Sequence, residues 1–335
     1  MALRSEAGIE LMMKQILALD PVTYQRHLIH GENRIWAETN CYVDVWTELL
    51  HCWGFEPIAA LPFTLAIDFE GDQWTFFKFP HCDLYRLYGL DIQELAIWRT
   101  LVDHIEEQVT LGRPVLVELD SYFLPDTAGT AYQREHVKST VAVNAIDVSN
   151  RKLGYFHNQG YYSLEGDDFI NVFRLQEPRD PAHLPPYVEF VKRRLPTALI
   201  GGDLVQVSLA LLRDQIAMLP DVNPFEKFKA RFVIDLKWLA TETLDAFHRY
   251  SFATLRQFGA CYELSATYLS WLQMGTQLEF DKPIALLTEL ATDAKTLQFQ
   301  LARSIMRKKP LDLSAIDRMA TQWQAAMDGV KAIAL

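Results

Sequence analysis

The sequence predicts an α+β domain in residues 1–176 followed by an all-helical domain in residues 187–335. In the first part, short apolar segments rich in β-branched and aromatic residues alternate with turns, which is typical of strands. In the second part, long segments with helical periodicity follow one another. Four prolines stand between Gln176 and Pro186, a composition that excludes helix and central strand. We therefore expect the domain boundary in this segment.

Two helices and several strands are predicted in the first domain. Apolar residues between Tyr42 and Trp53 recur at helical spacing and form one stripe, so a helix is expected there. A second helix is expected from Ile92 to Val109, with Asp91 as its N-cap. Strands are expected over residues 61–71, 73–79, 114–120, 136–148 and 152–158.

The second domain is predicted to be an antiparallel helical bundle without internal repeats. Proline and glycine residues separate its predicted helices, which lie near residues 187–194, 202–218, 224–249, 251–273, 283–307 and 313–332. Gly259 falls inside one of these helices, where glycine costs about 1 kcal/mol relative to alanine. This cost indicates that Gly259 packs closely against another element.

The charge balance excludes several classes of partner. The 32 Lys and Arg residues against 43 Asp and Glu residues give a formal net charge of −11, which repels nucleic-acid phosphates and anionic lipids. No uninterrupted apolar stretch approaches the roughly 18 to 20 residues that span a bilayer, and the first residues carry acids where a signal peptide is basic. We expect a cytoplasmic protein that binds neither nucleic acid nor membrane.

The four cysteines, Cys41, Cys52, Cys82 and Cys261, stand far apart and form no CxxC pair. This spacing fits reduced thiols better than a disulfide framework or a structural zinc site. Neighbouring His, Cys and Asp residues have irregular spacings, so no metal and no cofactor are expected. If one of these cysteines has a functional role, we expect that role to depend on the reactivity of its thiol.

Cys41 is the strongest candidate nucleophile. If Thr39 or Asn40 caps the helix that follows, Cys41 lies in its first turn, where backbone N–H groups and the positive end of the helix dipole stabilise a thiolate. The same N–H groups can bind the oxyanion of an acyl transfer. The alternative interpretation is a small buried residue at a helix start.

A nucleophilic cysteine needs a base, and His136 at the start of strand 136–148 is the candidate. The turn at Ser149 and Asn150 predicts a hairpin whose second strand ends at Asn158. Asn158 is then expected to orient His136, which completes a Cys41, His136, Asn158 order along the chain.

The hairpin register leaves a second interpretation open. With a tight turn, Asn158 faces Val141, and a base that Asn158 orients is then expected nearer Ser139 than His136. Three residues of strand separate these two positions by about 10 Å unless the strand bulges or curls. This register favours a protein in which the three residues do not form a catalytic triad.

The order of these residues resembles the papain-like cysteine fold. Asp120-Ser121-Tyr122-Phe123-Leu124-Pro125, followed by His136 and Asp147, resembles the N-terminal domain of the butirosin-pathway acyltransferase group. The whole chain resembles an uncharacterised bacterial family whose genes often stand beside carrier-protein aminoacylation enzymes, through the motifs IWAETNCYVDVW, DFEGDQWTFFKFP, LPDTAGT, HVKST and GYFHNQGY. The butirosin group implies transfer of an acyl or aminoacyl group from a carrier-protein thioester, through a cysteine, onto an amine.

One departure from the papain-like pattern concerns the oxyanion hole. That family places a glutamine about six residues before the cysteine to donate a hydrogen bond to the oxyanion. Ile35 stands at this position here, so Asn33, Glu38 or Asn40 would have to substitute for the glutamine.

Three further residues are candidates for substrate binding. Asp120, at a strand end, and Tyr122 are expected to contact a substrate amine, and the alternative is that they anchor the loop. His157, beside Asn158, is expected to line the same cleft, and the alternative is a histidine packed in the core.

The first functional hypothesis is therefore a papain-like acyltransferase whose donor is an acyl carrier protein, with or without a phosphopantetheine arm. A non-catalytic protein that binds the carrier protein or an aminoacylated intermediate is the alternative from another class. A cysteine hydrolase or amidase, with water as acceptor, is a third. Basic clusters at residues 192–194 and 303–309 are candidate docking surfaces for an acidic carrier, although both are predicted to end helices, where cations complement the dipole.

Overall fold

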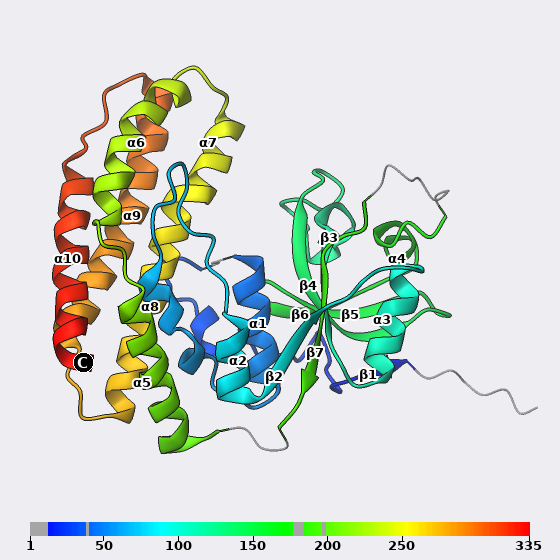
Figure 1. The fold of residues 1–335 in the computed structure, drawn as a ribbon. Helices are drawn as coiled ribbons and strands as arrows, with labels where there is room; N and C mark the ends of the chain where they lie inside the picture. The colour runs from blue at the N-terminus through cyan, green and yellow to red at the C-terminus, as the bar shows by residue number, and fades with distance from the viewer. Residues whose placement is uncertain (1–12, 38–39, 177–183, 196–198) are drawn as a thin grey trace, which may run out of the picture. The chain divides into compact units, whose positions relative to one another are not determined.

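The computed structural model describes residues 13–37, 40–176, 184–195 and 199–335 (Figure 1). These residues form two compact units: the first contains the described residues up to Arg26 and those of Asp91–Arg193, and the second contains those of His27–Leu90 and Arg194–Leu335. The expected α+β region followed by a helical region is confirmed, because every described element from Gly201 onward is a helix. Residues 177–183 of the proline-rich segment lie outside the described residues, and the division into 1–176 and 187–335 stays a prediction.

The first unit is built on a seven-stranded sheet in the order β2-β7-β3-β4-β5-β6, with β1 beside β4. The strands are β1 (Lys14–Gln15), β2 (Leu90–Glu94), β3 (Val115–Asp120), β4 (Lys138–Asp147), β5 (Lys152–His157), β6 (Gly160–Glu165) and β7 (Val188–Arg193). β4 pairs antiparallel with β1, β3 and β5, and β3 also pairs antiparallel with β7. The predicted strands at 114–120, 136–148 and 152–158 are therefore confirmed, together with the hairpin that joins the last two.

Helices α3 (Leu101–Thr110) and α4 (Asp167–Val172) belong to the same unit as the sheet (Figure 1). Their buried apolar side chains join those of the strands in one core, for example Ile105 and Phe169 with Val117 and Val143. Each such side chain contributes about 1.5–3 kcal/mol on burial. This apolar core holds the strands in register and so fixes the positions of the polar side chains at their ends.

The second unit contains α1 (Cys41–Cys52), α2 (His81–Tyr88), α5 (Gly201–Ala217), α6 (Pro224–Leu239), α7 (Leu244–Ser251), α8 (Gln257–Gly275), α9 (Asp281–Arg307) and α10 (Ser314–Ala334). α9 packs along both α8 and α10. Within the described ranges, no helix combines the length and apolar character needed to cross a membrane.

Gly259 packs closely against another element, as its place in a helix indicates. A Cβ atom at this position would lie 2.6 Å from the indole of Trp36. Trp36 is held there because its indole N–H donates to the carbonyl of Ala291 at 3.1 Å, and its backbone N–H donates to Glu263 at 2.9 Å. The segment before α1 is thus fastened to α8 and α9.

Residues 61–79 were expected to form two strands, and this prediction is wrong. They contain a 3-10 helix at Pro62–Ala66 and one isolated bridge between Phe69 and Trp74. The Trp74 ring lies 4.9 Å from that of Phe225 and 4.8 Å from that of Phe258, centroid to centroid. The aromatic side chains that suggested strands are buried against helices instead of pairing in a sheet.

The predicted helix at 187–194 is also wrong, because these residues form β7. Val188 and Phe190 pair with Val117 and Val115 of β3. β-Branched and aromatic residues favour the pleated backbone once a neighbouring strand is available. The basic cluster at 192–194 therefore ends a strand, and Lys192 pairs with Asp91 at 3.2 Å.

Three helix boundaries differ from the prediction. The segment after Asp91 first continues β2, and α3 begins only at Leu101, after Thr100, whose hydroxyl accepts the Asp103 N–H. The single helix expected at 224–249 is divided into α6 and α7, because Thr243 caps a new helix by accepting the Ala246 N–H. α7 then continues through a π-helical turn at Phe252–Arg256 into α8.

Candidate functional site

Cys41 is the first residue of α1, as the capping pattern predicted. Asn40 is the N-cap: its Oδ1 accepts the Val43 N–H at 3.0 Å. The Asn40 amide also donates to the carbonyl of Phe77 at 3.0 Å, so both ends of this buried side chain have protein partners. Glu38 and Thr39 lie outside the described residues. The geometry explains Asn40 as a cap, and its predicted role in substrate binding stays a prediction.

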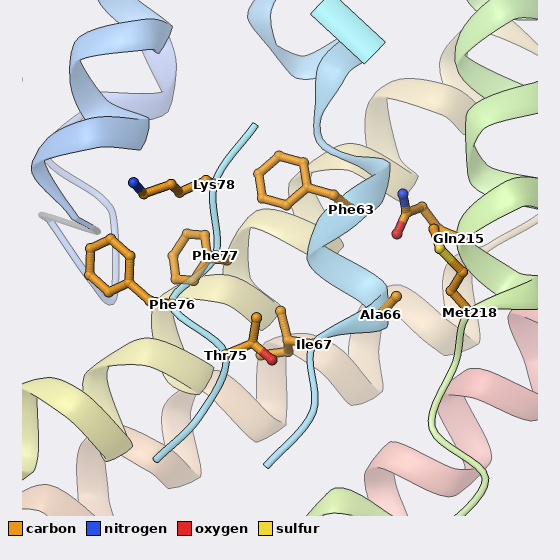
Figure 2. A pocket seen from close by; sticks show the side chains of 9 residues that line it. All are labelled: Phe63, Ala66, Ile67, Thr75, Phe76, Phe77, Lys78, Gln215 and Met218. Carbon is orange, nitrogen blue, oxygen red and sulfur yellow. The ribbon is translucent and has the colours of Figure 1, made fainter. Parts of the chain in front are cut away.

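A cavity of about 210 Å³ lies in the second unit (Figure 2). Its lining is mainly apolar and comprises Phe63, Ala66, Ile67, Thr75, Phe76, Phe77, Lys78, Gln215 and Met218. The Lys78 ammonium lies 4.6 Å from the centroid of the Tyr42 ring, and the Tyr42 hydroxyl lies 3.0 Å from His81 Nε2. Together with the Asn40 contact to Phe77, these interactions place one wall of the cavity beside the first turn of α1.

The other three cysteines have different surroundings. Cys52 is the last residue of α1, at the negative end of the same helix. Cys82 is an exposed residue, but partial burial of its thiol and the neighbouring Asp83 raise the pKa of this thiol. Complete burial raises the pKa of Cys261 well above its ordinary value. Cys41 is thus the only one of the four at the beginning of a long helix.

His136, Asp120 and Tyr122 come together in the first unit, where β3 ends and β4 begins. His136 Nδ1 lies 2.6 Å from Asp120 Oδ2, and the imidazole stacks on the Tyr122 ring at 4.4 Å between centroids. Because a carboxylate only accepts, Asp120 fixes the proton of a neutral His136 on Nδ1 and leaves Nε2 as the basic nitrogen. The His136 side chain is 68% exposed, so this oriented base is open to solvent.

Asn158 lies in the turn between β5 and β6 with a positive φ of 47°. His157 pairs with Gly160 across this two-residue turn, a geometry that asparagine tolerates better than most residues. The expected pairing of Asn158 with Val141 is off by one residue, because β4 bulges between Val143 and Ala145 and brings His157 opposite Val141.

This shift assembles a second hydrogen-bonded group that the sequence analysis missed. Ser139 Oγ lies 2.6 Å from His157 Nε2, and His157 Nδ1 lies 2.6 Å from Asp126 Oδ2. The Tyr155 hydroxyl donates to the other Asp126 oxygen at 2.6 Å. The alternative of a packed histidine describes His157 well, since its side chain is only 1% exposed. Alternation along β5 alone shows that Tyr155 and His157 share one face, but Ser139 joins that face only because of the bulge in β4.

The predicted site residues are thus distributed over both units. Cys41 and Asn40 belong to the second unit, whereas Asp120, Tyr122, His136, His157 and Asn158 belong to the first. Within the first unit, the partner that orients His136 is Asp120. The Cys41–His136–Asn158 triad stays a prediction.

A buried ionic cluster in the second unit was also missed. His30 Nδ1 contacts Glu48, and His30 Nε2 lies 3.2 Å from Asp44 Oδ1; all three side chains are almost completely buried. Burial opposes the charged imidazole, but hydrogen bonds to both carboxylates outweigh it and raise the pKa of His30 to about 9. Across the described ranges, no group of three or more His, Cys, Asp or Glu side chains is arranged to hold a metal ion. The cluster therefore joins the segment before α1 to α1 by ion pairing.

Two family models together match most of the chain. The DUF1839 N-terminal domain matches residues 25–193, and the DUF1839 C-terminal domain matches residues 202–332. The chain belongs to the DUF1839 family. A search of the curated proteins finds no match.

Both DUF1839 matches contain residues described above. The N-terminal match includes Cys41, the His136–Asp120 pair and the Ser139–His157–Asp126 group. The C-terminal match includes Gln215 and Met218 of the cavity. The cavity in the second unit is therefore lined by residues from both DUF1839 domains.

Proposed function

We propose that this DUF1839 protein transfers an acyl or aminoacyl group from a carrier-protein thioester to an amine, with Cys41 as the nucleophile. The observation that carries the proposal is the position of Cys41 as the first residue of α1, a helix of 12 residues capped by Asn40. Negative charge is favoured at such an end by the helix dipole. A thiolate there is both a good nucleophile and a good leaving group.

The proposed reaction has two steps. The Cys41 thiolate attacks the donor carbonyl and forms a new C–S bond, while the C–S bond to the carrier breaks and the carrier's sulfur leaves with a proton from the protonated imidazole that serves as the acid. The acceptor amine then attacks the Cys41 thioester, forms an amide and releases the Cys41 sulfur. The first step needs an acid that gives a proton to the leaving sulfur, and the second step needs a base that accepts the proton of the attacking amine.

The cavity beside the first turn of α1 supports a small acyl group. Its volume of about 210 Å³ is below the roughly 300–1,000 Å³ of pockets for drug-sized ligands. Phe63, Ile67 and Phe77 offer apolar contacts, and Lys78 and Gln215 offer polar ones. This lining suits an amino-acyl group or a short acyl group better than a long lipid chain.

We assign proton transfer to His136, because Asp120 orients its Nδ1 and leaves Nε2 on an exposed ring. Papain-like enzymes use a cysteine, a histidine and an acid or amide that orients the histidine. We extend the resemblance to these enzymes to the first half of this chain. Asp120 takes the orienting role that the sequence suggested for Asn158.

The test is covalent loading of Cys41. The full-length protein is incubated with an aminoacylated carrier protein, and the intact mass and the peptides are measured before and after addition of an amine. The proposal expects one acyl increment on Cys41, lost in Cys41→Ala and discharged by the amine. Asp120→Asn and His136→Gln should load at least tenfold more slowly. Loading that is unchanged in Cys41→Ala would refute the role of Cys41.

Cys52 provides a matched control, because it lies at the opposite end of the same helix. Alkylation with limiting iodoacetamide at pH ~6.5, followed by peptide mapping, should modify Cys41 before Cys52, Cys82 and Cys261. Cys52→Ala should leave acyl loading unchanged. Faster alkylation of Cys52 than of Cys41 would remove the basis for a helix-stabilised thiolate.

A non-catalytic carrier-binding protein is the second candidate, and the Ser139 position favours it. The register expected from the sequence placed the base nearer Ser139 than His136, and Ser139, which is hydrogen-bonded to His157, is a poor base. In that case the wild type and Cys41→Ala bind the carrier equally and neither gains mass. The exposed basic end of α9, at Arg303 and Arg307, is then the docking surface to test by charge reversal.

A further inference from the structure

Ser139, His157 and Asp126 form a continuous hydrogen-bonded relay within the first unit. Ser139 on β4 and His157 on β5 are joined through Nε2 at 2.6 Å, and His157 is joined through Nδ1 to Asp126 at 2.6 Å. Asp126 lies in the 3-10 turn Pro125–Thr127, and a second hydrogen bond from Tyr155 holds its carboxylate in place. Three different elements therefore fix the three side chains.

The chemistry of the partners sets the direction of each hydrogen bond. An ionised Asp126 only accepts, so the proton on the neutral His157 ring resides on Nδ1. His157 Nε2 then carries the lone pair and accepts the Ser139 hydroxyl proton. This is the arrangement in which an imidazole removes a proton from an attacking hydroxyl, with a carboxylate holding the ring in the required tautomer.

The relay lies at the border between core and solvent. The His157 and Asp126 side chains are 1% and 3% exposed, which shields the base and its orienting acid from water. Ser139 is the first buried residue of β4 and retains 8% exposure, whereas residues 133–138 before it are all exposed. The hydroxyl is thus the member of the relay nearest to an approaching substrate.

We propose that Ser139 is a second nucleophile of this protein, which accepts an acyl group from an activated ester or thioester. The Ser139 oxygen forms a bond to the acyl carbonyl as its proton moves to His157 Nε2. The bond from the carbonyl to the leaving alcohol or thiol then breaks, and that group departs with the proton from His157. Water, activated by the same imidazole, cleaves the Ser139 ester and restores the hydroxyl.

This inference does not depend on Cys41, so its test uses the full-length Cys41→Ala protein. An alkyl fluorophosphonate, which phosphonylates activated serines and releases fluoride, is the probe, and modified peptides are mapped over time. Ser163 on β6 is the internal control, since it lies on the same sheet and is more exposed than Ser139. The relay predicts labelling of Ser139 at least tenfold faster than labelling of Ser163.

Two variants separate activation from simple access. Ser139→Ala should lose the label. Asp126→Asn should slow labelling of Ser139 at least tenfold, because an amide no longer holds the proton of the His157 ring on Nδ1. Ser163→Ala should leave labelling of Ser139 unchanged. Labelling of Ser139 no faster than that of Ser163 in the parent protein would overturn the proposal, even if Asp126→Asn fails to fold. Equal labelling rates in the parent and a folded Asp126→Asn would also overturn it.

Discussion

Raising the pH from 6.5 to 9 should destabilise the second unit by about 3 kcal/mol, because His30 retains a proton that the unfolded chain releases. The two carboxylates that enclose His30 raise its pKa from 6.5 to about 9 against the opposing effect of burial. One pKa unit corresponds to about 1.4 kcal/mol, which gives the stated magnitude. His30, Asp44 and Glu48 are all buried, so solvent screens the interaction little.

The sign follows from the number of protons bound in each state. Below pH 6.5 His30 is protonated in both states, and its full contribution is present. Between 6.5 and 9 only the folded state keeps the proton, so the free energy of unfolding falls as the pH rises. His27 acts in the opposite sense: burial and the nearby His51 lower its pKa to about 4, so stability falls as the pH drops below 6.5. The stability of this unit should therefore peak near pH 6.5.

Urea unfolding followed by tryptophan fluorescence measures this unit, because every tryptophan except Trp98 belongs to it. His30→Gln should remove the slope between pH 6.5 and 9. It should also cost about 3–5 kcal/mol at pH 6.5, since it leaves buried carboxylates without a counter-charge. His248→Gln, at an exposed position on α7, should leave the profile unchanged. A flat wild-type profile from pH 6.5 to 9, or an unchanged slope in His30→Gln, would show that His30 does not cause the pH dependence.

Two substitutions test local geometry. Gly259→Ala should destabilise the second unit by about 1–3 kcal/mol in urea unfolding, because the new methyl group would lie 2.6 Å from the Trp36 indole. Gly202→Ala is the control and should not destabilise the unit, because a Cβ atom there has no atom within 4 Å. Equal losses of stability in the two variants would contradict the close packing of Gly259. Asn158→Ala should cost the first unit about 1–2 kcal/mol because of its positive φ, whereas Asn158→Gly should retain both stability and acyl loading of Cys41. Loss of loading in a stable Asn158→Gly protein would instead support Asn158 as the group that orients His136.

Features that depend on neighbouring residues could be predicted from the sequence. Asn40 caps α1 through a hydrogen bond to a residue three positions later, so the start of the helix at Cys41 follows from local chemistry. The hairpin between β4 and β5 depends on a short turn between two β-branched segments, which is equally local. In the second unit, the long apolar periodicities predicted α5, α9 and α10 to within a few residues.

Features that depend on distant partners could not be predicted. Phe69 and Trp74 have the composition of strand residues, and only the presence of α6 and α8 makes helix packing their better environment. Val188 to Val191 became a strand because β3 offers an unpaired edge more than sixty residues earlier in the chain.

The polar side chains of the first unit also depend partly on neighbouring residues and partly on distant ones. The sequence predicted strand ends at Asp120, His136 and Asn158 and a hairpin that joins the last two strands, because strand periodicity and turn composition are local properties. Which polar side chains pair was decided by the tertiary structure: a one-residue bulge in β4 sets the register that brings His157 opposite Val141 and within reach of Ser139. A bulge changes register at little cost to local pairing, so its position depends on the packing of the whole sheet and not on the residues beside it.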